Sequence, residues 1–282
     1  MSPASFLLSD KKCLELCYKL SMHKHLDIDN PKTLNEKIQW LKLYDRNPLY
    51  TTMADKSEAY KYALKVGEGG INIVEQYGKW SSFDEIDFSI LPNQFVLKCN
   101  HDSGSVVICK DKSNFDKKAA KKKLEKKLHT NFYWFGRQFH YKNIKPCIIA
   151  EKYMAELSGF MTDYKFLCFN GEPLVLYVAQ GMDNHSTGIV TFYDINKNPL
   201  PVKLADYNNI PKDFEWPNCY PEMVSFARKS ASSMNAKFVR VDLYCIQNKI
   251  YFSEYTFYPT NGYQKFDPIA FDKVFGEMLK LY

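Results

Sequence analysis

Two acidic residues near the C-terminal end are spaced so that they could share a cation. Asp242 and Glu254 lie in two neighbouring strand-like runs that predict a hairpin. With a three-residue loop over residues 247–249, the two carboxylates oppose each other on one face, together with Arg240 and Thr256. Opposed acids repel each other unless a cation lies between them, and Mg²⁺ favours hard oxygen ligands. Either a metal ion or a bridging Arg240 accounts for this pattern.

Two lysines interrupt apolar runs in a way that suits phosphate binding. Lys98 and Lys165 each stand within a predicted strand, on the face opposite its apolar residues. A lysine there either reaches solvent at a sheet edge or contacts a phosphate as a point charge. The small residues Ser103, Gly104 and Ser105 follow Lys98, and their size would let backbone N–H groups approach an anion. Taken alone, this loop is more typical of an ordinary turn than of an anion site.

The elements that must position these residues are mainly strands. The predicted strands cover residues 94–99, 105–109, 148–154, 164–169, 173–179, 189–193, 238–246 and 250–257. The third of them ends in Glu151, Lys152, Tyr153 and Met154, a run that by itself indicates only a buried structural strand. Residues 196–221 predict a long loop, and 222–234 predict a helix. The pattern therefore predicts an α+β protein with mainly antiparallel strands.

The first ninety residues predict helices instead. Thr33 followed by Glu36 is a capping-box pattern, after which apolar residues repeat at helical spacing. A second helix is predicted over residues 54–66. A third helix, residues 115–129, carries seven lysines against two acids: Lys117, Lys118, Lys121, Lys122, Lys123, Lys126 and Lys127. Such a run is typical of a solvated face, and the alternative is a surface that binds a polyanion.

Composition excludes several classes of protein. The chain of 282 residues is 45% hydrophobic and 25% charged, which is ordinary for a globular enzyme. Its net charge of +6 favours anionic partners. It has no apolar run long enough to cross a membrane and no C-x-x-C pair for zinc. Aromatic residues do not alternate with the lysines as in RNA-binding modules, so no nucleic-acid partner is expected. We expect a cytoplasmic protein, with at most peripheral membrane association.

The order of these pieces resembles the ATP-grasp superfamily. The runs Pro31–Pro48, Leu91–His101, Arg240–Tyr244 and Ser253–Phe257 are similar to its TupA-like branch, which is linked to polysaccharide and teichuronopeptide biosynthesis. The resemblance implies an ATP-grasp fold, in which two α+β lobes grip ATP between antiparallel sheets, preceded by a helical N-terminal region. It divides the chain into a helical region (1–90), a small lobe with the phosphate loop and the lysine-rich helix (91–150), and a large lobe with the metal-binding hairpin (151–282).

The resemblance gives each nucleotide-binding candidate a role. Lys98 would hold the ATP phosphates and act in catalysis, and Ser103, Gly104 and Ser105 would form a flap over them. The run Glu151, Lys152, Tyr153 and Met154 would read adenine through backbone hydrogen bonds. Lys165 would be a second contact, to phosphate or ribose.

The resemblance also assigns the metal and the catalytic arginine. Asp242 and Glu254 would hold Mg²⁺, and Arg240 would stabilise the transferring phosphoryl group and the tetrahedral intermediate. Thr256 stands where many ATP-grasp enzymes have a metal-binding Asn, and Asn261 is an alternative ligand.

Three functions follow as hypotheses. The first is an ATP-dependent ligase that activates a uronic-acid or glutamyl carboxylate as an acyl-phosphate and joins it to a small-molecule amine, on an acidic glycan or peptide of a capsule or cell-wall polymer. The second is a glycosyltransferase of the same biosynthesis, which should show a short acidic motif after a Rossmann-like strand. The third is a non-catalytic protein that binds polyanions through the lysine-rich helix. The identities of the substrates and the oligomeric state do not follow from the sequence.

Overall fold

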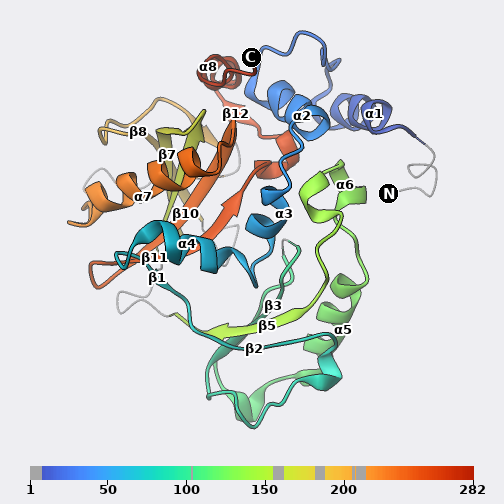
Figure 1. Cartoon of the computed structure of the whole chain (residues 1–282), viewed down its shortest axis with the longest axis vertical. Coiled ribbons are helices and arrows are strands. Elements are labelled where there is room, and N and C mark those ends of the chain that lie inside the picture. Colours follow the sequence, from blue (N-terminus) through green and yellow to red (C-terminus); the bar gives the residue numbers. More distant parts are fainter. Residues whose placement is uncertain (1–7, 103, 155–161, 182–187, 205–206, 208–213) are drawn as a thin grey trace.

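The core of the protein consists of two sheets of mainly antiparallel strands, one above the other in Figure 1. The computed structural model describes residues 8–102, 104–154, 162–181, 188–204, 207 and 214–282. The larger sheet contains β1 (Asn72–Ile73), β6 (Thr162–Phe169), β7 (Glu172–Gln180), β8 (Ile189–Asp194), β10 (Phe238–Ile246) and β11 (Lys249–Thr256). The smaller sheet contains β2 (Gln76–Trp80), β3 (Phe95–Cys99), β4 (Val107–Cys109) and β5 (Ile148–Lys152). Their order is β1-β11-β10-β6-β7-β8 and β2-β5-β3-β4, with only β1 and β11 parallel within the two sheets.

Helices pack against both sheets. The described helices are α1 (Asp10–Met22), α2 (Leu34–Tyr44), α3 (Leu49–Ala54), α4 (Ala59–Gly67), α5 (Lys117–Leu128), α6 (Tyr133–Gly136), α7 (Tyr220–Ser233) and α8 (Ala270–Met278). In Figure 1, α1, α2 and α8 lie at the top, and α5 lies beside the smaller sheet at the bottom. A short strand, β9 (Lys203–Leu204), lies within the segment that the sequence predicted as a long loop, and it pairs with β12 (Phe266–Asp267). The predicted α+β class with antiparallel sheets is confirmed.

Two helix predictions are confirmed in detail. Thr33 and Glu36 form the capping box at the start of α2, each side chain accepting the other residue's backbone N–H. The lysine-rich helix α5 buries Ala120, Leu124 and Leu128 against the smaller sheet and leaves most of its lysines in solvent. Among the described residues, no helix combines the length and the apolar character needed to cross a membrane.

The helix predicted over residues 54–66 is interrupted. Ala54 ends α3, and the next helix starts only at Ala59. The Asp55 carboxylate accepts hydrogen bonds from the backbone N–H and the hydroxyl of Ser57, at 2.8 Å each. Such local bonds compete with helical ones. The break leaves Lys56 in a short link between two helices.

The β10–β11 hairpin keeps the predicted face but reaches it differently. The loop has two residues, Gln247 and Asn248, rather than three, and both adopt left-handed φ values of 49° and 60°. A two-residue loop alone would move Glu254 out of register with Asp242. A β-bulge at Ser253 adds one residue to β11 and restores the pairing. The predicted loop length is wrong, and the predicted opposition of the two acids is confirmed.

Strand pairing joins the three predicted regions of the chain. β1 and β2 belong to region 1–90, yet β1 pairs with β11 and β2 pairs with β5. β5 itself spans the predicted boundary between residues 150 and 151. The division into 1–90, 91–150 and 151–282 stays a prediction.

Helix α2 buries a row of polar side chains that hold the chain after β11. Asn35, Gln39 and Lys42 are completely buried. Asn35 exchanges hydrogen bonds with the backbone of Gln264, and Gln39 donates to the carbonyls of Asn261 and Gly262. Lys42 donates to Gln39 and to both oxygens of Asn261 at 2.6–2.8 Å. These bonds fix residues 261–264, which follow the strand that carries Glu254.

Candidate functional site

The charged face of the larger sheet is assembled by direct strand pairing. Asp242 on β10 pairs with Lys165 on β6 and with Glu254 on β11, while Arg240 pairs with Thr256. Alternation places these side chains on one face, and it turns the apolar residues of the same strands into the core. The sequence prediction of a shared face is therefore confirmed, and Lys165 belongs to it as well.

Asp242 is at the centre of this cluster and is fully paired. Arg240 donates from Nε to Asp242 Oδ1 and from Nη2 to Oδ2, both at 2.6 Å. Lys165 Nζ donates to Oδ2 at 2.7 Å. The Asp242 side chain is 0% exposed. Two cations and three short contacts thus hold this carboxylate in one orientation.

Electrostatics keep the cluster ionised despite its burial. Burial opposes ionisation of Asp242, but Arg240 and Lys165 outweigh it and hold the pKa of Asp242 below its ordinary value. Burial also disfavours charge on Lys165, yet Asp163 and Asp242 raise its pKa overall. At Asp163 burial prevails, and its pKa is raised. The network therefore presents fixed charges on a face that excludes most water.

Glu254 is the open side of the cluster. Its side chain is 35% exposed, and its contacts are long: 3.4 Å to Arg240 Nη2, 3.3 Å to Thr256 Oγ1 and 3.8 Å to Lys56 Nζ. Thr256 lies within the cluster, donating to Glu254 and accepting from Arg240. Asn261 does not, because its side chain is held by Lys42 and the Phe135 carbonyl. Of the two alternatives, Thr256 is the one beside the acids.

A second group of predicted residues lines a cavity of about 200 Å³ between the two sheets. Lys98 and Glu151 lie on one face of neighbouring strands, and their charged groups form an ion pair of 2.5 Å. The cavity wall includes Lys56, Lys98, Glu151, Lys152, Tyr153 and Met154. Its far side is formed by Tyr244, Phe252 and Ser253 of the β10–β11 hairpin. Five predicted residues, from β3, from the end of β5 and from the two positions after it, are thus brought together.

The predicted phosphate loop is described only in part. Ser103 lies outside the described residues. Gly104 is exposed with φ +89°, which suits a turn that lacks a side chain. Ser105 is buried, and its hydroxyl donates to Asp102 at 2.5 Å and accepts the Cys99 N–H at 2.8 Å. Any anion contact of Ser105 would therefore come from its backbone.

Lys56 connects the two groups, and the sequence did not predict this position. Its ammonium donates to the Asp102 carbonyl at 2.6 Å and lies 3.8 Å from Glu254 Oε2. It also lines the cavity that holds Lys98 and Glu151. The only signal was an Asp-Lys-Ser run in a predicted helix, where Asp and Ser disfavour helix interiors.

A family model described as TupA-like ATPgrasp matches residues 36–280. This chain belongs to the TupA-like ATP-grasp family. The match covers most of α2 as well as both sheets. The predicted ATP-grasp fold is confirmed.

Solved structures of ATP-grasp ligases resemble this member of the family only distantly. D-alanine–D-alanine ligase from Bacillus anthracis has 20% identity and a TM-score of 0.42, over 73% of this chain and 57% of that chain. L-amino acid ligase from Bacillus licheniformis has 13% identity and a TM-score of 0.48, over 91% of this chain and 57% of that chain. The chain thus spans somewhat more than half the length of these structures. Among curated proteins, none matches it at the sequence level.

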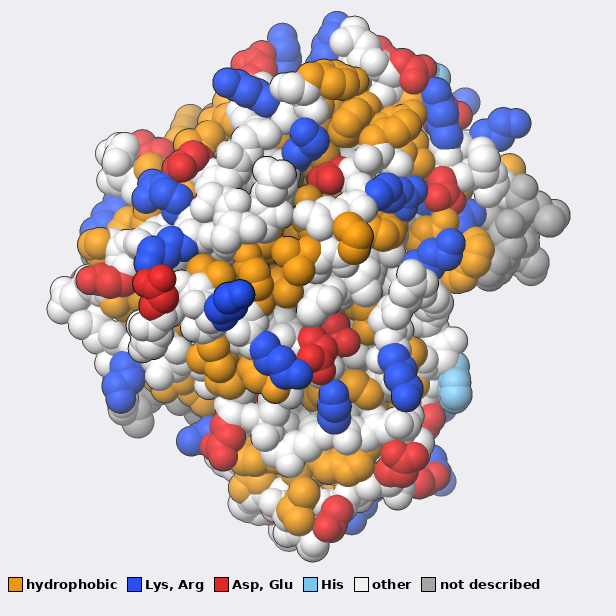
Figure 2. Space-filling model, viewed as in Figure 1, with side chains coloured by type: hydrophobic (Ala, Val, Ile, Leu, Met, Phe, Trp, Pro, Cys, Tyr) orange, Lys and Arg blue, Asp and Glu red, His pale blue; other side chains and the backbone are white. Residues whose placement is uncertain are grey.

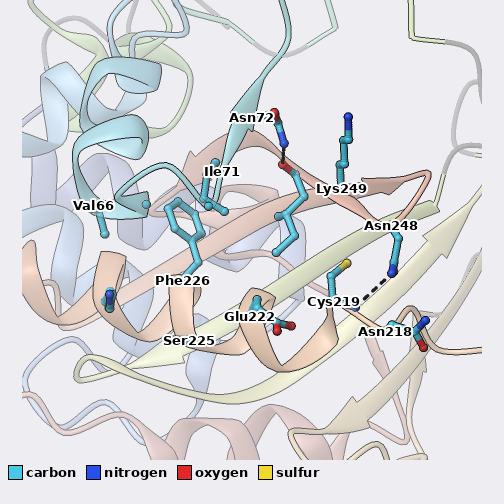
Figure 3. A pocket seen from close by; sticks show the side chains of 14 residues that line it. Val66, Ile71, Asn72, Asn218, Cys219, Glu222, Ser225, Phe226, Asn248 and Lys249 are labelled. Carbon is cyan, nitrogen blue, oxygen red and sulfur yellow. Dashed lines mark hydrogen bonds between the residues drawn. The ribbon is translucent and has the colours of Figure 1, made fainter.

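A further cavity holds none of the predicted site residues. This cavity, of about 570 Å³, lies where the α4–β1 connection meets α7 and the turn of the hairpin, and Figure 3 shows Asn72, Glu222 and Asn248 along it. On the face drawn in Figure 2, basic and acidic side chains are interspersed rather than separated. Within the described residues, no group of three or more His, Cys, Asp or Glu could hold a metal ion.

Proposed function

We propose that this TupA-like ATP-grasp protein is an ATP-dependent carboxylate–amine ligase with ADP and phosphate as products. The observation that carries the proposal is the paired cluster of Arg240, Asp242 and Lys165, which faces Glu254 and adjoins the cavity of Lys98. Phosphoryl transfer needs positioned cations rather than a covalent nucleophile, and this cluster supplies fixed cations. Family membership supports the same class of reaction.

The proposed reaction has two steps, phosphoryl transfer and amide formation. A carboxylate oxygen of the acceptor attacks the γ-phosphorus of ATP, and the bond to the β-phosphate oxygen breaks to release ADP. The amine nitrogen then attacks the acyl carbon, the bond to phosphate breaks, and the amine loses a proton to solvent. Lys98 and Lys165 bind phosphate oxygens, and Arg240 offsets the negative charge that develops in both steps.

The acids of the cluster suit Mg²⁺ to different degrees. Glu254 fits a metal well, because its oxygens are partly exposed and make only long contacts. Asp242 fits only if it exchanges one of its contacts with Arg240 or Lys165, since both of its oxygens are engaged. With phosphate oxygens as the remaining ligands, two carboxylates are enough for Mg²⁺. When bound, Mg²⁺ would neutralise charge on the phosphoryl group in transfer.

The cavity between the sheets is the proposed adenosine site. Residues 151–154 line this cavity, and we propose that the edge of adenine bonds to their main-chain groups. Val96, Ile108 and Phe252 provide apolar surface for the base. Gly104 and the backbone beside it would close over the phosphates.

The substrate proposal remains the one made from the sequence. The acceptor is a uronic-acid or glutamyl carboxylate of an acidic glycan or peptide, the donor is a small amine, and the process is capsule or cell-wall polymer synthesis in the cytoplasm. Lys118, Lys122 and Lys126 on the exposed face of α5 would retain such a polymer through weak, salt-sensitive attraction. Peripheral association with polymer-synthesis machinery accords with this arrangement.

The alternative functions receive less support. A sugar-nucleotide glycosyltransferase was expected to show a short acidic motif after a Rossmann-like strand, whereas the acids here lie on antiparallel strands. A non-catalytic polyanion-binding protein would need the lysines of α5 but not the buried cluster of the larger sheet.

The test is a screen of ATP turnover with uronic acids and glutamyl peptides as acceptors and amino acids as donors. We expect ADP release only when both substrates are present, with an amide product in the mass spectrum. ATP cleavage to AMP, or consumption of a sugar nucleotide instead, would overturn the proposal.

A further inference from the structure

Two half-buried cysteines from separate elements bring their sulfur atoms into contact. Cys219 directly precedes α7, and Cys245 lies on β10, 26 residues further along the chain. Their Sγ atoms are 3.2 Å apart, close enough for a thiol hydrogen bond, and both thiols are free. The contact therefore joins the start of a helix to the strand that carries Asp242.

The backbone around Cys219 holds its sulfur against the hairpin. The Cys219 side chain makes no hydrogen bond that caps α7. Its backbone N–H donates to Asn248 Oδ1 at 3.3 Å, and Asn248 belongs to the turn of the β10–β11 hairpin. Cys245 lies close to the same turn, where it pairs with Ile250. Two contacts, one through the backbone and one through sulfur, thus fix Cys219 against this end of the hairpin.

A small molecule can reach the sulfur pair from solvent. Cys219 lines the cavity of about 570 Å³ beside α7, and Figure 3 shows its side chain between Asn248 and Glu222. Among the described residues, this cavity shares no lining residue with the cavity of Lys98. A small neutral oxidant such as hydrogen peroxide therefore has a route to the thiols that avoids the proposed adenosine site.

We propose that Cys219 and Cys245 are an oxidation site, at which a peroxide converts the two thiols into a reversible disulfide. The Cys245 sulfur attacks one oxygen of hydrogen peroxide, the O–O bond breaks, and a sulfenic acid and water form. The Cys219 sulfur then attacks the Cys245 sulfur, and the S–O bond breaks. The leaving hydroxide takes the Cys219 proton and becomes a second water. Two electrons pass from the thiols to the peroxide, and thiol reductants reverse the step.

The order of the two sulfurs follows from their surroundings. Burial and the neighbouring Cys245 sulfur raise the pKa of Cys219 to about 12. A thiol with so high a pKa is rarely a thiolate at neutral pH, so Cys219 is the second sulfur to react. The disulfide closes a loop of 26 residues, which restricts the unfolded chain, while the sulfurs already touch in the reduced fold. Oxidation therefore stabilises the folded protein and links α7 to β10.

The test is a tryptic peptide map of the reduced protein before and after treatment with hydrogen peroxide. Trypsin cuts between the two cysteines at Arg228, so a disulfide joins two peptides that otherwise separate. We expect joined peptides in the oxidised wild type and their separation by dithiothreitol. Cys219→Ser should give no joined peptides and should keep Cys245 as a sulfenic acid that dimedone traps. Cys147→Ser removes a half-buried thiol outside the pair, and this matched control should behave like the wild type.

Two results of the peptide map would overturn the proposal. One is free thiols at both Cys219 and Cys245 after peroxide treatment. The other is joined peptides found only where Cys168 has also reacted, because this thiol is 0% exposed and reports unfolding.

Urea denaturation gives a second, independent measurement. The midpoint of the oxidised wild type should rise by about 1 M, and that of peroxide-treated Cys219→Ser should not rise. Equal midpoints of the reduced and oxidised wild type would contradict a disulfide that links α7 to β10 in the folded protein.

Discussion

The two charged groups of the molecule differ in how completely their charges are paired. On the larger sheet, Asp242 receives three short contacts from Arg240 and Lys165 and has no exposed surface. On the smaller sheet, Glu151 has one short contact, to Lys98, and both side chains stand at a cavity wall. The first group is preorganised, since its charges are fixed before any substrate arrives. In the second group, Lys98 can exchange Glu151 for a phosphate. Such an exchange suits ligand binding rather than transition-state stabilisation.

The largest expected effect comes from breaking the paired cluster. Arg240→Met leaves Asp242 buried with Lys165 as its remaining cation, and removing one partner of a buried pair costs about 3–5 kcal/mol. We expect that loss in the free energy of unfolding measured in urea, together with a fall in turnover of about 10²–10³. Arg228→Met, which breaks the exposed pair with Glu172, should cost about 1 kcal/mol or less. Equal losses in both variants would show that the cluster is no more preorganised than a surface pair.

The second prediction concerns the exchangeable pair. Lys98→Ala should weaken ATP binding by about 1.5–3 kcal/mol, because a charge-assisted phosphate contact is lost, while the protein stays folded. Glu151→Gln should leave ATP affinity equal or higher, because it removes the ionic competitor for Lys98. Calorimetry on both variants checks this, and an unchanged affinity in folded Lys98→Ala would remove Lys98 from the nucleotide site.

These two groups also differ in what the sequence predicts about them. The acids of the hairpin were predicted to share a face because alternation and symmetric spacing fix side-chain direction. The turn and the bulge that produce this arrangement were not predicted. A two-residue turn with a bulge at Ser253 places Glu254 opposite Asp242, and so does a three-residue loop without a bulge, so spacing alone cannot distinguish the two. Most strand positions were likewise predictable from local pattern, whereas a shared site for Lys98 and Glu151 followed only from the family resemblance.

Residues whose roles depend on distant pairing were missed. Asn35, Gln39 and Lys42 have the composition of a solvated helix face, yet they are buried because the backbone of residues 261–264 needs their hydrogen bonds. Lys56 faces the cavity because Asn100 holds its backbone, a contact that links segments 44 residues apart in the chain. No local pattern contains such information.

The third prediction concerns the effect of pH on the free energy of unfolding, through a buried histidine beside the larger sheet. His140 is 2% exposed and packs against Phe257, just beyond the end of β11. Burial, aided by the charges of Lys42 and Lys56, lowers its pKa to about 3. The unfolded chain protonates this histidine near pH 6.5 and the folded protein does not, so the stabilising effect is complete above pH 6.5 and is lost as the pH falls toward 3.

At pH 5 this loss amounts to about 2 kcal/mol relative to pH 7.5. Urea denaturation of the wild type and His140→Phe at both pH values measures it, and the variant should have the smaller pH dependence. Part of the dependence should remain, because burial also lowers the pKa of His101. An identical pH dependence of the free energy of unfolding in the wild type and the variant would show that protonation of His140 does not destabilise the protein at low pH.

The smallest effect is expected at the turn that positions the acids. Gln247 has φ +49°, a conformation that a β-branched residue adopts poorly. Gln247→Val should lower the free energy of unfolding by about 1–2 kcal/mol, and Gln247→Gly should change it by less than about 1 kcal/mol. Equal stabilities of the two variants would argue against the two-residue turn.

The central claim is that the preorganised cluster activates a carboxylate as an acyl-phosphate, and labelled oxygen tests it most directly. The acceptor carboxylate is labelled with oxygen-18 and incubated with enzyme, Mg²⁺, ATP and the amine, and the released phosphate is analysed by mass spectrometry. We predict one labelled oxygen in each phosphate released and none in ADP, because the carboxylate oxygen attacks phosphorus and leaves with it. Unlabelled phosphate formed alongside the amide product would contradict the mechanism.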